Sequence, residues 1–144
     1  MMARGDSSAP EDLVRRFVEL AWNQGEEQLA AGLLGTEFEH HDLVTDVESD
    51  AAGYLKSILG VRAAFSAIEL QIHEMIASEG RVAYRWRAVG THAVTGLVVI
   101  DGMSIDHVAE GRIVQNWTVW DRAWLERELP SLLRPGEDGS QDGG

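Results

Sequence analysis

Apolar residues recur at helical spacing near the start of the chain, in the segment SAPEDLVRRFVELAWNQG. Ser8 can cap this helix, Pro10 suits its first turn, and Gly25 ends the run. The apolar positions are Leu13, Val14, Phe17, Val18 and Ala21. This spacing places them on one face, so we predict an amphipathic helix that buries that face.

Two more helices and one extended piece are predicted before residue 66. The string EEQLAAGLL is typical of a short helix that ends at Gly35. The string DAAGYLKSILGVRAAFS is typical of a longer helix, which Gly60 is expected to interrupt. Between the two, EFEHHDL predicts a short extended segment.

After Ser66 the apolar residues change from helical spacing to alternation, which is the pattern of β-strands. Four long strands are predicted, with the sequences IELQIHEMIAS, RVAYRWRAVGTHA, LVVIDGMSIDHVAE and RIVQNWTVWDRAW. The turns between them fall at Glu79-Gly80, Thr95-Gly96 and Glu110-Gly111. Because these connections are short, consecutive strands are expected to be antiparallel neighbours.

Helices followed by strands predict an α+β fold, with three N-terminal helices packed on a curved, mostly antiparallel sheet. Both faces of the late strands are apolar. On one of them, Val82, Tyr84, Trp86 and Ala88 share a face. An antiparallel sheet normally leaves one face in water, so the second apolar face predicts a homodimer that pairs through the sheet.

Composition indicates one globular domain. The chain has 144 residues, of which 44% are hydrophobic, enough for a real core. We expect the domain to span 11–130, between a disordered N-terminus at 1–10 and a disordered acidic, glycine-rich tail at 131–144. No signal peptide or membrane span is evident, which predicts a cytoplasmic protein.

Charge and residue types limit the partners and cofactors. The formal net charge of −12 repels nucleic acid and anionic membranes, so neither is expected as a partner. The chain has no cysteine, which excludes disulfides, thiolate metal ligands and thiol nucleophiles. His40 and His41 are adjacent, but neighbouring strand residues point to opposite faces and no third ligand is suitably spaced. No metal is therefore expected.

Several strings, in this order, resemble the SnoaL-like polyketide cyclases of the nuclear-transport-factor-2-like (NTF2-like) superfamily. They are AWNQG, GYLKSILGVRAAFS, EGRVAYRWRAVGTH and IDHVAEGRIVQNW. The resemblance runs over about 12–129 and implies a conical α+β fold, with a pocket between the concave sheet face and the helices. The best-known members of this family close an aromatic polyketide ring by an intramolecular aldol step without metal or cofactor, using a His and an Asp on the last two strands.

The chain departs from this family at the residues that carry the aldol chemistry. Alignment of the acidic-Gly-basic turn places the family's His on Ser104 and its Asp on Thr118, while an Asn of the family's pocket falls on His40. An unactivated hydroxyl is no general base near neutral pH. His107 and Asp121 lie three residues further along, on the opposite face of each strand.

Expectations for the pocket residues follow from the family's inward-facing positions. Asp106 is the only carboxylate on those positions, and burial would raise its pKa, so it is a candidate general acid or base. The alternative is a structural carboxylate bonded to Asn116 or to a backbone amide. His40 is the best histidine candidate, with His41 and Asp42 as supporting groups. The expected substrate-binding residues are Tyr54, Tyr84, Trp86, Ser104, Asn116, Thr118 and Trp120.

Three further expectations concern the surroundings of the pocket. The connection at 92–100 is shorter than in the family, so either the pocket is naturally more open or a mobile loop has been removed. Trp22 is expected to support the fold rather than the chemistry. Trp117 and His107 are expected to face outward, into the dimer contact.

The preferred hypothesis is a cofactor-independent polyketide cyclase of antibiotic biosynthesis that folds an apolar polyene for C–C ring closure. A [4+2] cycloaddition suits this hypothesis, as in an indane-forming cyclase of the indanomycin type, because it needs an apolar mould and at most a hydrogen bond to a carbonyl. Ser104, Thr118 or Asn116 would donate that bond. One alternative is an acid–base aldol cyclase, isomerase or hydrolase that uses Asp106 and His40. Another is a non-catalytic binding module.

Overall fold

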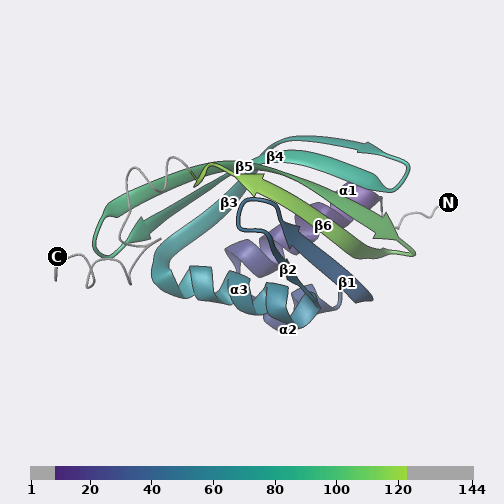
Figure 1. Cartoon of the computed structure of the whole chain (residues 1–144), viewed down its shortest axis with the longest axis horizontal. Coiled ribbons are helices and arrows are strands. Elements are labelled where there is room, and N and C mark those ends of the chain that lie inside the picture. Colours follow the sequence, from purple (N-terminus) through teal and green to yellow (C-terminus); the bar gives the residue numbers. More distant parts are fainter. Residues whose placement is uncertain (1–8, 123–144) are drawn as a thin grey trace.

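A computed structural model describes residues 9–122, which form one strongly curved sheet with helices on its concave side (Figure 1). The helices are α1 (Pro10–Phe17), the π-helix η2 (Val18–Asn23), α2 (Glu27–Ala31) and α3 (Ala51–Ala64). The strands are β1 (Leu34–Asp42), β2 (Val47–Ser49), β3 (Phe65–Ser78), β4 (Arg81–His92), β5 (Gly96–Ala109) and β6 (Arg112–Trp120). The predicted α+β class is confirmed.

The sheet is mixed, with the strand order β2-β1-β6-β5-β4-β3. Strands β3 to β6 are consecutive antiparallel neighbours, as predicted. Strand β1 joins the other side of β6 in parallel, which places His40 opposite Asn116. The alternation of apolar residues does not reveal this long-range pairing, yet it delivers His40 to the concave face.

In two of the predicted turns, the backbone conformation explains why a glycine stands at the second position. Glu79 and Gly80 have φ values of 51° and 80°, and Glu110 and Gly111 have values of 52° and 74°. Positive φ at both central residues is the type I′ turn, whose twist matches that of the paired strands. These turns fix the register of the β3–β4 and β5–β6 hairpins.

The helices differ from the prediction at two places. Helix α3 runs without interruption through Gly60, because a single glycine weakens a helix by only about 1 kcal/mol and this helix buries Tyr54 and Ile58. Helix α2 ends at Ala31, earlier than predicted, and Leu34 belongs to β1, where it pairs with Ile113. The sequence also gave no sign of β2.

The end of the first helix is tied to the sheet by side-chain bonds. Asn23 accepts a hydrogen bond from the backbone N–H of Leu70 at 2.7 Å and donates one to its carbonyl at 3.2 Å. Arg62 of α3 donates to the carbonyl of Trp22 at 2.6 Å. These contacts hold the π-helical turn, and Trp22 with it, over the concave face of the sheet.

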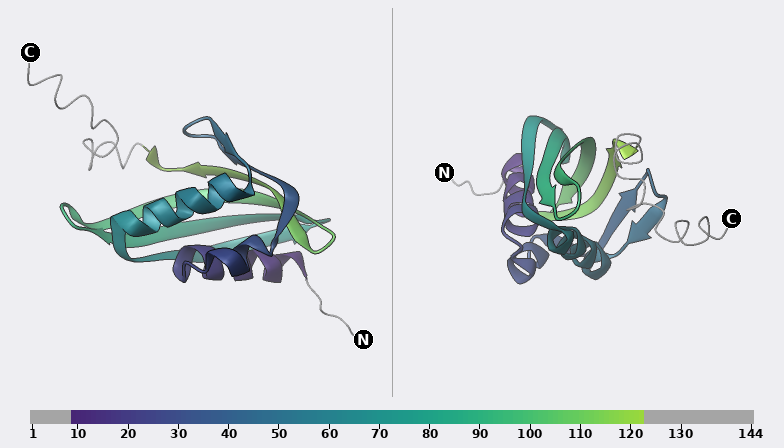
Figure 2. Two further views of the ribbon diagram at one scale, coloured as in Figure 1. Left: turned by 90° about the horizontal axis from the view of Figure 1, so that it is seen from below. Right: turned by 90° about the vertical axis from the view of Figure 1, so that its left-hand side faces the viewer.

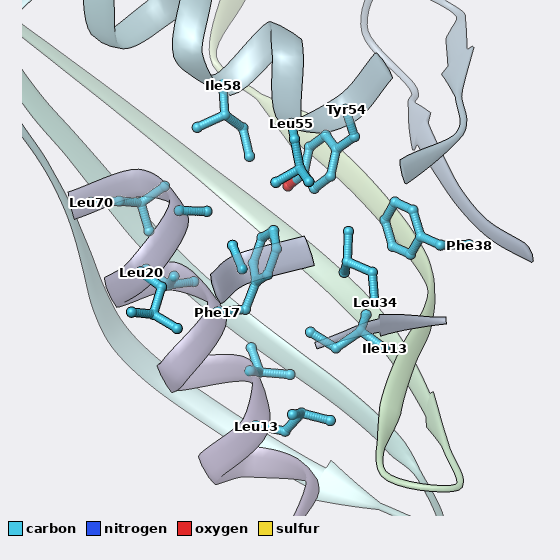
Figure 3. Close-up of a cluster of buried hydrophobic side chains, with 14 of the residues drawn as sticks. Leu13, Phe17, Leu20, Leu34, Phe38, Tyr54, Leu55, Ile58, Leu70 and Ile113 are labelled. Atoms are coloured by element: carbon cyan, nitrogen blue, oxygen red, sulfur yellow. The ribbon is translucent and has the colours of Figure 1, made fainter. Parts of the chain in front are cut away.

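The core lies between the helices and the sheet (Figure 3). The ring of Tyr54 stacks on Phe17 at 5.9 Å and on Phe38 at 5.6 Å, measured between centroids, so it joins α3 to α1 and β1. Other residues of this cluster include Leu13, Leu20, Leu34, Leu55, Ile58, Leu70 and Ile113. Figure 2 shows that the helices leave the convex face of the sheet uncovered.

Some expectations lie outside the described residues. They include the Ser8 cap, most of the 1–10 segment and the whole of the 131–144 tail; Ala9 stands at the N-cap of α1 and forms no side-chain cap bond. Within 9–122, no helix is long and apolar enough to cross a membrane.

Candidate active site

A cavity of about 620 Å³ lies between the concave face of the sheet, the end of the first helix and α3. Most of its wall is aromatic or aliphatic. Its lining includes Val18, Trp22, Phe65, Ile68, Leu70, Ala88, Val98, Ile100 and all but two of the predicted site residues, namely His40, Tyr54, Tyr84, Trp86, Ser104, Thr118 and Trp120. The two exceptions are Asp106 and Asn116, which lie behind the wall.

His40 reaches the cavity from β1. Its ring stacks on that of Tyr54 with 4.1 Å between centroids, and its Nδ1 lies 2.6 Å from Oδ1 of Asn116. Burial lowers the pKa of His40 below its usual 6.5, and the bond to Asn116 opposes this shift only in part. His40 is therefore a neutral imidazole near neutral pH.

Asp106 and Asn116 form a buried pair behind His40, each only 2% exposed. The amide nitrogen of Asn116 donates to Oδ1 of Asp106 at 2.5 Å, and the hydroxyl of Tyr84 lies 3.3 Å from both carboxyl oxygens. Burial raises the pKa of Asp106 to about 7, against the opposing effect of these two bonds. The bond to Asn116 is the one that the structural alternative predicted. Asp106 is connected to the cavity through Tyr84, which lines it, and through Asn116 and His40.

A second line of hydrogen bonds crosses β4, β5 and β6. The indole N–H of Trp86 donates to Oγ of Ser104 at 3.0 Å, and Ser104 lies 2.9 Å from Oγ1 of Thr118. Thr118 donates to Oδ1 of Asn116 at 3.0 Å. The polar residues between the aromatic ones on β6 thus belong to one network, which meets at the amide of Asn116.

Three aromatic residues complete the rim and the roof. Trp120 donates to both carboxyl oxygens of Asp42, at 3.2 and 3.3 Å. His92 lines the cavity at the end of β4. The expectation for Trp22 was incomplete, since it supports the fold through its carbonyl but also lines the cavity. Trp22 lies four residues after Val18, another lining residue, so the two share one helix face. This spacing is the signal that could have predicted that Trp22 lines the cavity.

The opposite face of the sheet carries the residues expected there. His41 points away from His40 and stacks on Trp117 at 4.9 Å, and His107 lies 4.7 Å from the same indole. Met103 and Ile105 are 56% and 45% exposed on this face. Among the described residues, no group of three or more His, Asp and Glu side chains could hold a metal ion.

Comparison with known proteins gives one family and a consistent fold. The sequence model of the SnoaL-like polyketide cyclase family matches residues 12–129. Wild-type IdmH from Streptomyces antibioticus, a candidate polyketide cyclase, is similar with 22% identity and a TM-score of 0.78, over 85% of this chain and 99% of that chain.

Two other solved structures agree. A candidate polyketide cyclase from Bacillus cereus has 21% identity and a TM-score of 0.77, over 90% of this chain and 85% of that chain. TsrD from Streptomyces laurentii has 18% identity and a TM-score of 0.74, over 88% of this chain and 98% of that chain. No curated protein matches by sequence.

Proposed function

The chain belongs to the SnoaL-like polyketide cyclase family, and we propose that it is a cofactor-independent cyclase of antibiotic biosynthesis. Its substrate is an apolar polyene or polyketide precursor, which it folds for intramolecular C–C ring closure. The observation that carries this proposal is the cavity of about 620 Å³, with its apolar wall and its few polar groups gathered on one side. Such a site shapes a chain-like ligand and fixes its pose.

The environment of Ser104 and Thr118 favours catalysis by conformational control. These residues stand where the resemblance places the His and Asp of aldol catalysis. They bond to each other, to Trp86 and to Asn116, none of which is a base that could activate a hydroxyl. Holding a flexible precursor in a reactive conformer can lower a barrier by up to ~7–11 kcal/mol. A concerted [4+2] closure that forms an indane needs no base and suits this mechanism.

The experiment uses a linear tetraene precursor and chiral analysis of the product. We expect one enantiomer, formed faster than in buffer. Ala88→Phe should abolish this by filling the cavity from β4. Ala83→Phe is the matched control, because Ala83 lies on the same strand with the opposite side-chain direction. A racemic product at the background rate would reject the proposal.

Acid–base chemistry is the second candidate, because His40 lines the cavity and Asn116 connects it to Asp106. It predicts an aldol cyclase, isomerase or hydrolase whose bell-shaped pH–rate profile collapses in Asp106→Asn. A flat profile favours conformational control. Tight binding of the precursor without turnover would instead indicate a binding module.

The proposed partners are the small-molecule polyketide substrate and a second copy of the chain. The convex sheet face exposes Met103, Ile105 and Val119, and no helix within residues 9–122 covers it, which supports a homodimer through this face. The net charge of −12 disfavours nucleic acid and anionic membranes. A cytoplasmic location stays a prediction.

A further inference from the structure

The hydrogen bonds around Asn116 have a definite direction. The carboxylate that Asp106 carries above its pKa of about 7 can only accept, so the amide nitrogen of Asn116 faces Asp106 and its oxygen faces His40. His40 must then carry its proton on Nδ1 in order to donate to that oxygen. A neutral imidazole has a single N–H, so Nε2 of His40 is left as an acceptor on a ring that lines the cavity.

The hydroxyl groups of Ser104 and Thr118 on the same wall also donate their protons to acceptors within the protein. Thr118 uses its proton to donate to Oδ1 of Asn116. The 2.9 Å contact between Ser104 and Thr118 therefore has Ser104 as its donor. Oγ of Ser104 in turn accepts from the indole of Trp86. Ser104 and Thr118 thus present oxygen lone pairs, and no proton, to the cavity.

Other donors of the lining are paired in the same way. Ser57 donates to the carbonyl of Tyr54 at 2.7 Å, the hydroxyl of Tyr84 donates to Asp106, and the indole of Trp120 donates to Asp42. The indole N–H of Trp22 bonds to the hydroxyl oxygen of Tyr54. Among the described lining residues, the donors without a protein acceptor are then the hydroxyl of Tyr54 and Nε2 of His92. The second follows because Nδ1 of His92 accepts from the backbone of Val94. His92 lies at the rim, whereas Tyr54 lies against His40.

We propose that the deep wall of this cavity is an array of hydrogen-bond acceptors, led by Nε2 of His40, that selects a ligand presenting a hydroxyl or enol O–H. The hydroxyl of Tyr54, stacked beside His40, supplies one donor. An enolised 1,3-dicarbonyl or a hydroxyketone carries the matching donor and acceptor together. The inference rests on the proposed function, since it names the substrate class of the same site.

This assignment differs from the expectation that Ser104, Thr118 or Asn116 donates to a ligand carbonyl. A ligand with carbonyls alone would leave the acceptors of the wall without partners, and buried acceptors without partners are unfavourable. An enol O–H satisfies one of them and is itself oriented for reaction. The wall thereby discriminates between the keto and enol forms of one precursor.

The first test is the position of the proton on His40, measured on the wild-type protein. Two-bond proton–nitrogen correlations of ¹⁵N-histidine-labelled protein distinguish the two ring nitrogens, and His40→Gln assigns the signal. We expect the proton on Nδ1 at about pH 8.5, where Asp106 is ionised. A proton on Nε2 overturns the proposal.

The second test compares 2-naphthol with 2-methoxynaphthalene by calorimetry. They differ in that the ether has no O–H to donate. We expect 2-naphthol to bind about three- to tenfold more tightly, the range of one net hydrogen bond, and His40→Phe to remove the difference. His41→Phe, on the opposite face, is the matched control and should keep it. Equal binding of the two compounds, no binding of either, or a preference that survives in His40→Phe overturns the proposal.

These two tests are independent of turnover. Failure of the tetraene precursor to cyclise would reject the proposed function and leave the acceptor wall in place. A His40 proton on Nε2 would reject the acceptor wall and leave the cyclase in place.

Discussion

The indole of Trp86 packs against the α-carbon of Gly102 on the neighbouring strand, in the space that a side chain at residue 102 would fill. This close approach is possible only because residue 102 has no Cβ. It sets the indole at the depth from which its N–H reaches Ser104. Gly102 therefore shapes the cavity without presenting any group to it.

Gly102→Ala should displace the indole of Trp86 and weaken its bond to Ser104. We expect the free energy of unfolding to fall by about 1–3 kcal/mol, the usual range for an overpacked core, with a shift in tryptophan fluorescence. Urea unfolding measures the first effect. Gly60→Ala is the control, because a Cβ there meets no atom within 4 Å and a helical alanine is favoured. Equal stability of the two variants would contradict the packing described.

Asn116→Leu should destabilise the fold more than Thr118→Val. The first change leaves the carboxylate of Asp106 and Nδ1 of His40 without their shared partner, whereas the second removes one donor at the cavity edge. We expect losses of about 2–3 and about 1 kcal/mol respectively, from urea unfolding. A larger loss in Thr118→Val would show that the network does not centre on Asn116.

Because of Asp106, we expect the stability of the protein to fall as the pH rises from about 4 to about 7. Its pKa is 3.8 in the unfolded chain and about 7 in the fold, so within this window the folded state alone holds the proton. Raising the pH removes that proton and the stabilisation with it. The lowered pKa of His40 acts in the opposite sense, since below about 6.5 the unfolded chain binds protons more readily.

Asp106→Asn separates these two contributions. The contribution of Asp106 makes the wild type more stable at about pH 5 than at about pH 8. We expect the variant to lack this contribution, so its unfolding free energy at about pH 5 should gain less over that at about pH 8. If the variant keeps the wild-type difference, the buried carboxyl is not its source.

Asn23→Ala should loosen the end of the first helix from β3. The side chain of Asn23 bonds both the backbone N–H and the carbonyl of Leu70. We expect the loss of these two bonds to lower the unfolding free energy by about 1–2 kcal/mol. Gln24→Ala is the matched control, because the neighbouring Gln24 is exposed and bonds only Glu19. Hydrogen exchange at the Leu70 amide gives a local measurement, and unchanged protection there would contradict the assignment.

Ile105→Lys tests the proposed homodimer. A charge in the middle of the convex face should shift the protein to a monomer in sedimentation velocity. Leu29→Lys replaces another exposed apolar residue, on α2 and away from the sheet, and should leave the oligomeric state unchanged. A wild-type protein that is already monomeric would reject the dimer.

Local patterns predicted much of this structure. Alternation placed Tyr84 and Trp86 on one face, which the family resemblance made the inward one, and the Glu-Gly pairs marked two of the hairpins. The pattern failed at Leu34, because a short apolar run suits a helix and a buried strand equally well. The position of Asp106 on the inward face was predictable, but its separation from the cavity by Asn116 depends on how two side chains pack. The parallel pairing of β1 with β6 joins residues far apart in the sequence and carries no local signature.

The parallel pairing of β1 with β6 also bears on the order in which parts of the structure form during folding. His40 and Asn116 are 76 residues apart, whereas the β3–β4 and β5–β6 hairpins close over turns of two residues. Closing a long loop is slower than closing a hairpin, so β1 is expected to dock late, after the meander has formed. Until it docks, the cavity lacks the side that carries His40. A ligand can then bind only to chains that have completed folding, and its binding stabilises those chains by mass action.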